Sequence, residues 1–256
     1  MPANNKKLKS LINLRDVGGV HAANGSAIKQ GIIFRSANPD RISTRDINAL
    51  KEMGIDVIVD LRAEYEYNKK KRRIDGIKVV SLPLDFEKET RELLYPYLYK
   101  KNSEDKILEI TASLYQMIID GSAQVFREVC ELIMQPGNRA VLIHCQAGKD
   151  RTGIISALIQ KLLGTPDETV IEEYLKSNIE LLPYFRRKML PRKILTLGKF
   201  PMETILFAIS VKEQNIRLVL DRLDKEYKGA ETFLVSAGFK PADLPKLKEK
   251  LLVNLD

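Results

Sequence analysis

The sequence has few of the residues from which disulfide frameworks and metal centres are built. Its 256 residues include two cysteines, two histidines and no tryptophan. Cys130 lies in an apolar helical stretch and Cys145 in a loop, and settings this different do not predict a disulfide. His21 and His144 add no convincing ligand cluster to these cysteines. We therefore expect no metal and no other cofactor.

Long apolar segments are also missing. The first ten residues lack the apolar core of a secretory leader, and no apolar run approaches the length of a membrane span. These absences predict a protein of the reducing cytoplasm. Apolar residues make up 44% of the chain and charged residues 30%, which predicts a sizeable core under a charged surface. The net charge of +8 favours anionic partners, such as phosphorylated substrates, acidic lipids or nucleic acid.

Short apolar runs alternate with helical patterns in the first part of the chain. The run at residues 56–61 predicts a buried strand because of its β-branched residues, and the runs at 77–82 and 140–143 predict two more. Residues 103–135 have apolar side chains near helical spacing. Strands that alternate with helices indicate an α/β fold with a mostly parallel sheet.

Several local signals predict where elements begin and end. The dipeptide Asn24-Gly25 predicts a tight turn between two short strands. Ser43 is the predicted cap of a helix that ends near Gly54. Thr165 is the predicted cap of a later helix, with Pro166 in its first turn.

The second part of the chain, from about residue 166 to the C-terminus, has an almost wholly helical pattern. No linker separates this part from the alternating part. We therefore expect residues 1–256 to form a single domain, with a core at about 1–165 and a helical extension at about 166–256.

The most informative segment is the loop at residues 144–153, His-Cys-Gln-Ala-Gly-Lys-Asp-Arg-Thr-Gly. A predicted strand precedes it and an apolar run, residues 154–159, follows it as a helix. Free backbone N–H groups at a helix start bind anions, so the loop is a predicted phosphate site. A thiolate at Cys145 would be a nucleophile directed at phosphorus, because a helix N-terminus and nearby cations lower a thiol pKa.

The other loop residues have roles that suit covalent phosphate chemistry. Arg151 can hold two phosphoryl oxygens with its planar guanidinium, and Lys149 adds positive charge. Thr152 can donate its hydroxyl to the sulfur, and His144 either hydrogen-bonds backbone near the loop or tunes it. We expect the phosphate to be bound by the residues that follow the cysteine, namely Gln146, Ala147, Gly148, Lys149, Asp150 and Arg151.

Two carboxylates are candidates for the general acid that protonates the leaving oxygen. Asp150 lies in the loop itself and is favoured. Asp85 follows a predicted strand and could lie on a loop above the site. The alternatives are that Asp150 orients Arg151 as an ion-pair partner and that Asp85 is a turn residue.

The loop differs from other phosphate-binding and cysteine-containing loops. A nucleotide-binding loop requires glycine where this chain has Ile143, and serine or threonine where it has Asp150. A rhodanese-like sulfur carrier also uses a loop cysteine, but the ending Gly-Lys-Asp-Arg-Thr-Gly does not suit it.

The loop resembles that of the bacterial tyrosine phosphatases with a His-Cys-x-x-Gly-Lys-Asp-Arg-Thr-Gly signature, known from mycobacteria and Listeria, within the cysteine-dependent phosphatases. Residues 13–19 (Asn-Leu-Arg-Asp-Val-Gly-Gly), 33–36 (Ile-Phe-Arg-Ser) and 60–62 (Asp-Leu-Arg) are similar to three N-terminal signatures of that family, in order. Residues 174–178 and the C-terminal tail are similar more weakly. The resemblance implies a tyrosine-phosphatase-type sheet flanked by helices, a helical lid and a helical C-terminal extension.

The resemblance also implies substrates. Phosphotyrosine and phosphoinositides are both substrate classes of that family, and its loop lysine, Lys149 here, is associated with inositol phosphates. Asp60, in the Asp-Leu-Arg signature, is a further candidate for the acid, or a structural partner of Arg62. The chain departs from the large eukaryotic tyrosine phosphatases because it has no Trp-Pro-Asp acid loop, so Asp150, Asp85 and Asp60 all stay candidates.

Basic runs occur at residues 69–73, 186–188 and 192–193. They are either solvated surface or sites of contact with an anionic membrane. Nucleic acid is not an expected partner, because no aromatic residues interleave these runs as stacking platforms.

We predict a phosphatase for phosphotyrosine, phosphoserine or phosphothreonine, and phosphoinositides. The alternatives are a phosphatase for inositol phosphates and an inactive phosphate-binding module.

Overall fold

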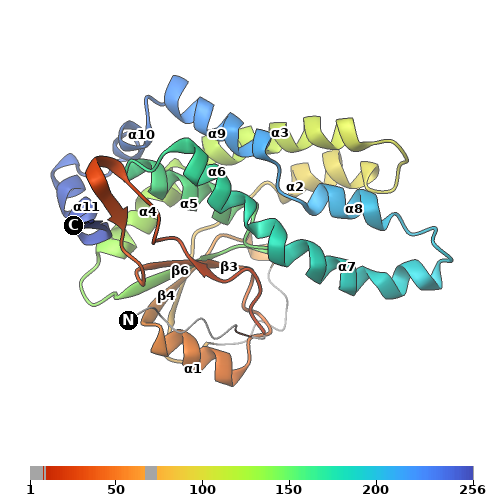
Figure 1. Cartoon of the computed structure of the whole chain (residues 1–256), viewed down its shortest axis with the longest axis horizontal. Coiled ribbons are helices and arrows are strands. Elements are labelled where there is room, and N and C mark those ends of the chain that lie inside the picture. The colour runs from red at the N-terminus through yellow and green to blue at the C-terminus, as the bar shows by residue number, and fades with distance from the viewer. Residues whose placement is uncertain (1–7, 9, 67–73, 256) are drawn as a thin grey trace.

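A computed structural model describes residue 8, residues 10–66 and residues 74–255. Its centre is a five-stranded sheet in the order β1-β3-β6-β4-β5 (Figure 1). The strands are β1 (Arg15–Asp16), β3 (Ile33–Ser36), β6 (Ala140–His144), β4 (Ile55–Asp60) and β5 (Lys78–Ser81). All neighbours are parallel except β1 and β3. The expected mostly parallel α/β sheet is thus confirmed.

Helices cover both faces of this sheet (Figure 1). The longer ones are α1 (Thr44–Glu52), α3 (Glu104–Gly121), α4 (Ala123–Met134), α5 (Asp150–Leu162), α6 (Asp167–Leu175), α7 (Ser177–Leu195), α8 (Met202–Ile209), α9 (Glu213–Lys225), α10 (Ala230–Ser236) and α11 (Leu244–Leu251). A helical turn, α2 (Glu87–Glu89), follows β5. Within the described ranges, no helix is long and apolar enough to cross a bilayer.

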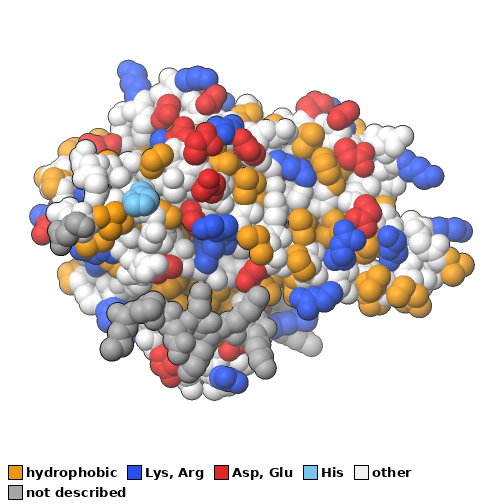
Figure 2. Space-filling view, viewed as in Figure 1, with side chains coloured by type: hydrophobic (Ala, Val, Ile, Leu, Met, Phe, Trp, Pro, Cys, Tyr) orange, Lys and Arg blue, Asp and Glu red, His pale blue; other side chains and the backbone are white. Residues whose placement is uncertain are grey.

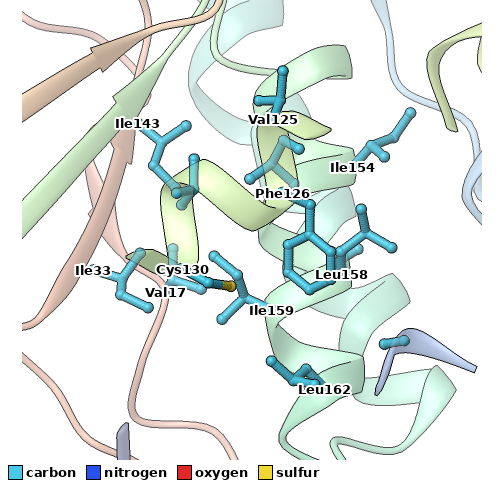
Figure 3. Packing of buried hydrophobic residues seen from close by; sticks show 14 of the residues in the cluster. Val17, Ile33, Val125, Phe126, Cys130, Ile143, Ile154, Leu158, Ile159 and Leu162 are labelled. Carbon is cyan, nitrogen blue, oxygen red and sulfur yellow. The ribbon is translucent and has the colours of Figure 1, made fainter. Parts of the chain in front are cut away.

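The alternation of side chains along the strands produces a core on each face. Ile58 and Leu142 pack in the cluster that contains Leu50 of α1. The strand residues between them, such as Ile143, point to the other face and pack against α4 and α5, where Cys130 is fully buried (Figure 3). The sheet is therefore held from both sides, and its carboxyl edge is a rigid platform for the loops that leave it.

The local predictions have mixed outcomes. The strand predicted at residues 77–82 exists as β5, but the prediction that it is buried is wrong, because three of its four residues are exposed at the edge of the sheet. Ser43 caps α1 by accepting a hydrogen bond from the backbone N–H of Asp46 at 3.1 Å. Asn24 and Gly25 both have positive φ, as a tight turn requires. The segment at 103–135, predicted to be helical, forms two helices, because the helix is interrupted at Ser122 between α3 and α4. The predicted cap at Thr165 is wrong, because Pro166 holds the N-cap position of α6.

The C-terminal helices pack on the alternating part of the chain. Val219 of α9 and Leu247 of α11 lie in the same buried cluster as Ile155 of α5. The tail is almost wholly helical as predicted, and its one described strand, β7 (Leu252–Asn254), pairs antiparallel with β2 (Ser26–Ile28). Helices α7 and α8 form a hairpin that projects from the body of the protein (Figure 1).

Candidate active site

The phosphate loop, defined here as residues 145–151, links the carboxyl end of β6 to the first turn of α5. Cys145 is buried and 3% exposed at the bottom of this loop. Gly148 has φ +66°, and a β-carbon there would overlap the carbonyl oxygen of Ser36 on the neighbouring strand. Glycine is therefore required at this position for the loop to bend against β3.

Residues of the N-terminal signatures hold the loop carbonyls. The Asn13 side-chain amide donates to the carbonyl oxygens of Ala147 at 3.1 Å and Gly148 at 2.9 Å. Arg35 donates to the Gly148 oxygen at 2.8 Å, and the Asn38 backbone donates to the Gln146 oxygen at 3.2 Å. These bonds occupy the loop carbonyls, which leaves the loop N–H groups for an anion.

Arg151 is held by a residue that the sequence reasoning missed, Glu66. Its two terminal nitrogens donate to the Glu66 carboxylate at 2.5 and 2.8 Å, and both side chains are almost completely buried. Nη1 also lies 3.4 Å from the carbonyl oxygens of Leu61 and Leu84. Burial opposes the charge of Arg151, but hydrogen bonds and charge from Glu66 outweigh it and raise the guanidinium pKa. Among the described residues nothing accepts from Nε–H, so this donor is available to a phosphoryl oxygen.

A second buried guanidinium lies close to the cysteine. Burial lowers the pKa of Arg35 to about 10, whereas a thiolate at Cys145 acts in the opposite direction. Arg35 and Arg151 both interact with that thiolate charge. The Thr152 hydroxyl is fully buried and has no hydrogen-bond partner in the described part of the chain, so the expected bond to the sulfur is not formed here.

Asp150 lies at the first turn of α5 with its side chain 26% exposed. Its ion-pair partner is Lys149, whose ammonium lies 2.9 Å from a carboxylate oxygen. The alternative that Asp150 forms an ion pair with Arg151 is therefore not what the structure shows. The buried hydroxyl of Tyr115 donates to the same carboxylate and also contacts the hydroxyl of Tyr174. Asp150 is thus held by two side chains, Lys149 and Tyr115, and Tyr174 in turn contacts Tyr115.

The two alternative acids lie in different environments. Asp60 is fully buried and accepts from Arg62 Nε at 3.0 Å and Nη2 at 2.9 Å. His144 Nε2 lies 3.6 Å from Asp60, and burial lowers the His144 pKa to about 4. Asp85 is exposed and accepts from the Tyr65 hydroxyl. This geometry favours a structural role for Asp60 and leaves Asp85 accessible.

Another missed cation, Lys212, lies in the turn between α8 and α9. Its ammonium is 3.8 Å from the centre of the Phe207 ring. Burial and the positive charge of Lys149 both lower the Lys212 pKa, so the two ammonium groups share one region. The turn is held by Asn178, which exchanges hydrogen bonds of 2.9 and 3.0 Å with the Val211 backbone.

The loop is predictable from the sequence, but its supporting residues are not. Glu66, Tyr115 and Lys212 have no neighbouring motif in the sequence and meet the loop only through the fold. The Asn-Leu-Arg and Phe-Arg-Ser signatures were the available signal for Asn13 and Arg35. The basic run at residues 69–73 lies outside the described residues.

The fold and this loop define the class as a cysteine-dependent phosphatase. Residues 6–253 match the family model described as the tyrosine phosphatase family, and the chain therefore belongs to that family.

Three relatives illustrate the similarity. A Cupriavidus necator protein, provisionally named a tyrosine-protein phosphatase, is 29% identical over 66% of this chain and 61% of its own length. The triple specificity protein phosphatase PtpB of Mycobacterium tuberculosis is 25% identical over 96% of this chain and 99% of its own. An inositol diphosphatase of Arabidopsis thaliana is 26% identical over 59% of this chain and 61% of its own. The family and these names support a phosphoric monoester hydrolase.

Proposed function

We propose that this protein hydrolyses phosphate monoesters through a phosphocysteine intermediate. The Cys145 sulfur attacks phosphorus and forms a P–S bond while the ester P–O bond breaks. Water then attacks the phosphocysteine, which releases inorganic phosphate and restores the thiolate. The loop N–H groups of residues 146–151 and the Arg151 guanidinium bind the phosphoryl oxygens as charge develops on them. The observation that carries this proposal is the Glu66–Arg151 pair, because it engages the two terminal nitrogens, and no described residue accepts from Arg151 Nε–H, which can then donate to a phosphoryl oxygen.

Asp150 is the proposed general acid. Its carboxyl lies in the phosphate loop, and the Tyr115 hydroxyl and the Lys149 ammonium hold its position. Asp85 is the alternative, since the residue before it, Leu84, has its carbonyl oxygen 3.4 Å from Arg151. Asp60 is less suitable, because Arg62 and full burial keep it from a leaving group.

Phosphotyrosine in proteins and phosphoinositides are the proposed substrates, with phosphoserine and phosphothreonine as further ones. Lys149 in the phosphate loop and Lys212, whose pKa the Lys149 charge lowers, support a polyanionic substrate, because they add positive charge at a site made for a single phosphate. The alternative is an inositol phosphate free in solution, which the same cations would suit. An inactive phosphate-binding module is disfavoured by the presence of both Cys145 and Arg151.

The cellular compartment of the enzyme is inferred from its chemistry. A reduced Cys145 is required for turnover, so we propose the reducing cytoplasm. The packing of Val219 and Leu247 with Ile155 supports one phosphatase domain over residues 1–256. A phosphoinositide substrate further implies peripheral contact with an anionic membrane.

Substrate class is tested by comparing kcat/KM for a phosphotyrosine peptide, a soluble inositol phosphate and a phosphoinositide in vesicles. The Lys212→Gln variant is expected to lower kcat/KM for both inositol-containing substrates by about tenfold and to leave a small aryl phosphate unaffected. Lys161→Gln, on the far turn of α5, is the matched control. Equal losses on all substrates would contradict the polyanion proposal.

A further inference from the structure

The α7–α8 hairpin carries a projecting apolar end. At this end, residues 190–197, four aliphatic side chains are exposed, namely Leu190 at 46%, Ile194 at 65%, Leu195 at 82% and Leu197 at 90%. Apolar side chains gather at the free end of the hairpin in the space-filling view (Figure 2). Large aliphatic residues this exposed on one convex feature mark a surface that is covered in use.

Leu197 has an unusual backbone conformation for its type. The Gly198 N–H donates to the Lys193 carbonyl oxygen at 2.8 Å and the Leu197 N–H to that of Ile194 at 3.0 Å. This closing pattern of a helix puts Leu197 at the left-handed position after the cap, with φ +50°. Glycine usually takes that position because a β-carbon there is strained. A leucine in this place, pointing into solvent, is explained by a role outside the folded chain.

The charges around the apolar end have one sign. Residues 181–202 contain six basic residues and no acidic residue. Glu203 pairs with two of the six, Arg186 at 2.9 Å and Lys193 at 3.6 Å. The other four have no carboxylate within ion-pair distance in the described part of the chain, and they are Arg187, Lys188, Arg192 and Lys199. Blue side chains flank the apolar group in Figure 2. Exposed aliphatic groups beside unpaired cations are complementary to an anionic bilayer surface.

The base of the hairpin is joined to the catalytic loop. Ser177, the first residue of α7, accepts a hydrogen bond from Arg15 at 2.9 Å, and Arg15 in turn donates to Asn13, which holds the phosphate loop. The second helix of the hairpin, α8, is followed by the turn that carries Lys212. The hairpin therefore connects its projecting end to the residues that hold the phosphate loop.

We propose that residues 190–197 at the end of the α7–α8 hairpin insert into an anionic lipid bilayer, with the unpaired basic residues on phosphate headgroups. A role of this insertion in catalysis rests on the proposed phosphoinositide activity. The binding of the hairpin to the bilayer does not rest on that activity.

Binding is tested by sedimentation of the full chain with vesicles of phosphatidylcholine alone or mixed equally with phosphatidylserine. We expect binding to the mixed vesicles only, weakened by salt. The Leu195→Ser/Leu197→Ser variant is expected to bind at least about tenfold more weakly. Val253→Ser/Leu255→Ser, exposed apolar residues of the C-terminal strand region, is the matched control and should bind like wild type. Equal binding by both variants would overturn the proposal.

Two further variants distinguish insertion from a structural role. Leu197→Gly should weaken vesicle binding while the midpoint of thermal unfolding stays equal or rises, because glycine removes left-handed strain. Leu197→Trp gives the chain its only tryptophan, whose emission should shift to the blue with mixed vesicles. Binding without that shift contradicts insertion.

Two outcomes point elsewhere. Loss of self-association in the serine variant, with vesicle binding unchanged, would assign the end of the hairpin to a second copy of the chain. If wild type does not bind vesicles, membrane insertion is rejected. If wild type and the Leu195→Ser/Leu197→Ser variant both still hydrolyse a soluble aryl phosphate, the proposed phosphatase activity is unaffected by that result. Failure of that hydrolysis in wild type would instead reject the phosphatase.

Discussion

The pair between Glu66 and Arg151 yields the sharpest prediction. Glutamine at position 66 keeps one acceptor oxygen but presents an amide N–H₂ to the other guanidinium nitrogen, so one charge-assisted hydrogen bond and the carboxylate charge are lost. The side chains of Arg151 and Glu66 are 8% and 7% exposed, which means that water screens the pair little. A hydrogen bond to a charged group contributes about 1.5–3 kcal/mol. We expect the free energy of unfolding of Glu66→Gln to fall by about 2 kcal/mol.

The effect on catalysis should be separable from that loss. A guanidinium free to rotate binds the transition state less well, so kcat on an aryl phosphate should fall about 100-fold, equivalent to about 2.7 kcal/mol. Both parameters are measured on protein shown to be folded by circular dichroism at the assay temperature. Glu64→Gln, an exposed residue of the same turn, is the matched control and should retain wild-type kcat. A folded Glu66→Gln enzyme with wild-type kcat would refute the positioning role of Glu66.

Three further predictions follow from the site. Gly148→Ala should abolish most activity and destabilise the fold, because its β-carbon would overlap strand β3, whereas Gly137→Ala, with no atom within 4 Å of its added carbon, should cost only about 1 kcal/mol in unfolding and no activity. Asp150→Asn should lower kcat by about 100-fold for alkyl phosphates and far less for p-nitrophenyl phosphate, since good leaving groups need no proton; an equal loss on both would move the acid role to Asp85. Burial holds the His144 pKa at about 4, below about 6.5 in the unfolded chain, so the stability from this group is complete above pH about 6.5 and is lost as the pH falls toward about 4. Urea unfolding should therefore show that His144→Asn loses about 3 kcal/mol less than wild type over that range, and identical pH profiles would contradict the assignment.

Elements with strong local signals were predictable from sequence. The strand at β4 follows from its β-branched run, and α1 follows from the Ser43 cap and the glycine beyond its end. The phosphate loop was also predictable, because its chemistry lies in consecutive residues. Cys145, Asp150 and Arg151 could therefore be predicted together as candidate site residues. The structure adds the side chains that contact them, such as Glu66 and Tyr115.

Features that depend on distant pairing were not predictable. Strand β7 has three residues and follows an amphipathic helix, and its partner β2 lies more than two hundred residues earlier. Thr165 looked like a helix cap, but its hydroxyl is buried without a partner in the described chain. Glu66 and Tyr115 reach the loop only once the sheet and α3 are assembled. Their roles come from tertiary packing, which local propensity does not encode.

The covalent intermediate is the central claim, and it can be measured directly. Reduced wild-type protein would be mixed with p-nitrophenyl phosphate without added metal, quenched with acid and digested for mass spectrometry. We predict one phosphoryl group on the peptide that contains Cys145, a burst of p-nitrophenol in rapid mixing, and neither signal in Cys145→Ser. Phosphate release that persists in Cys145→Ser, or turnover without any phosphorylated Cys145 peptide, would contradict the account.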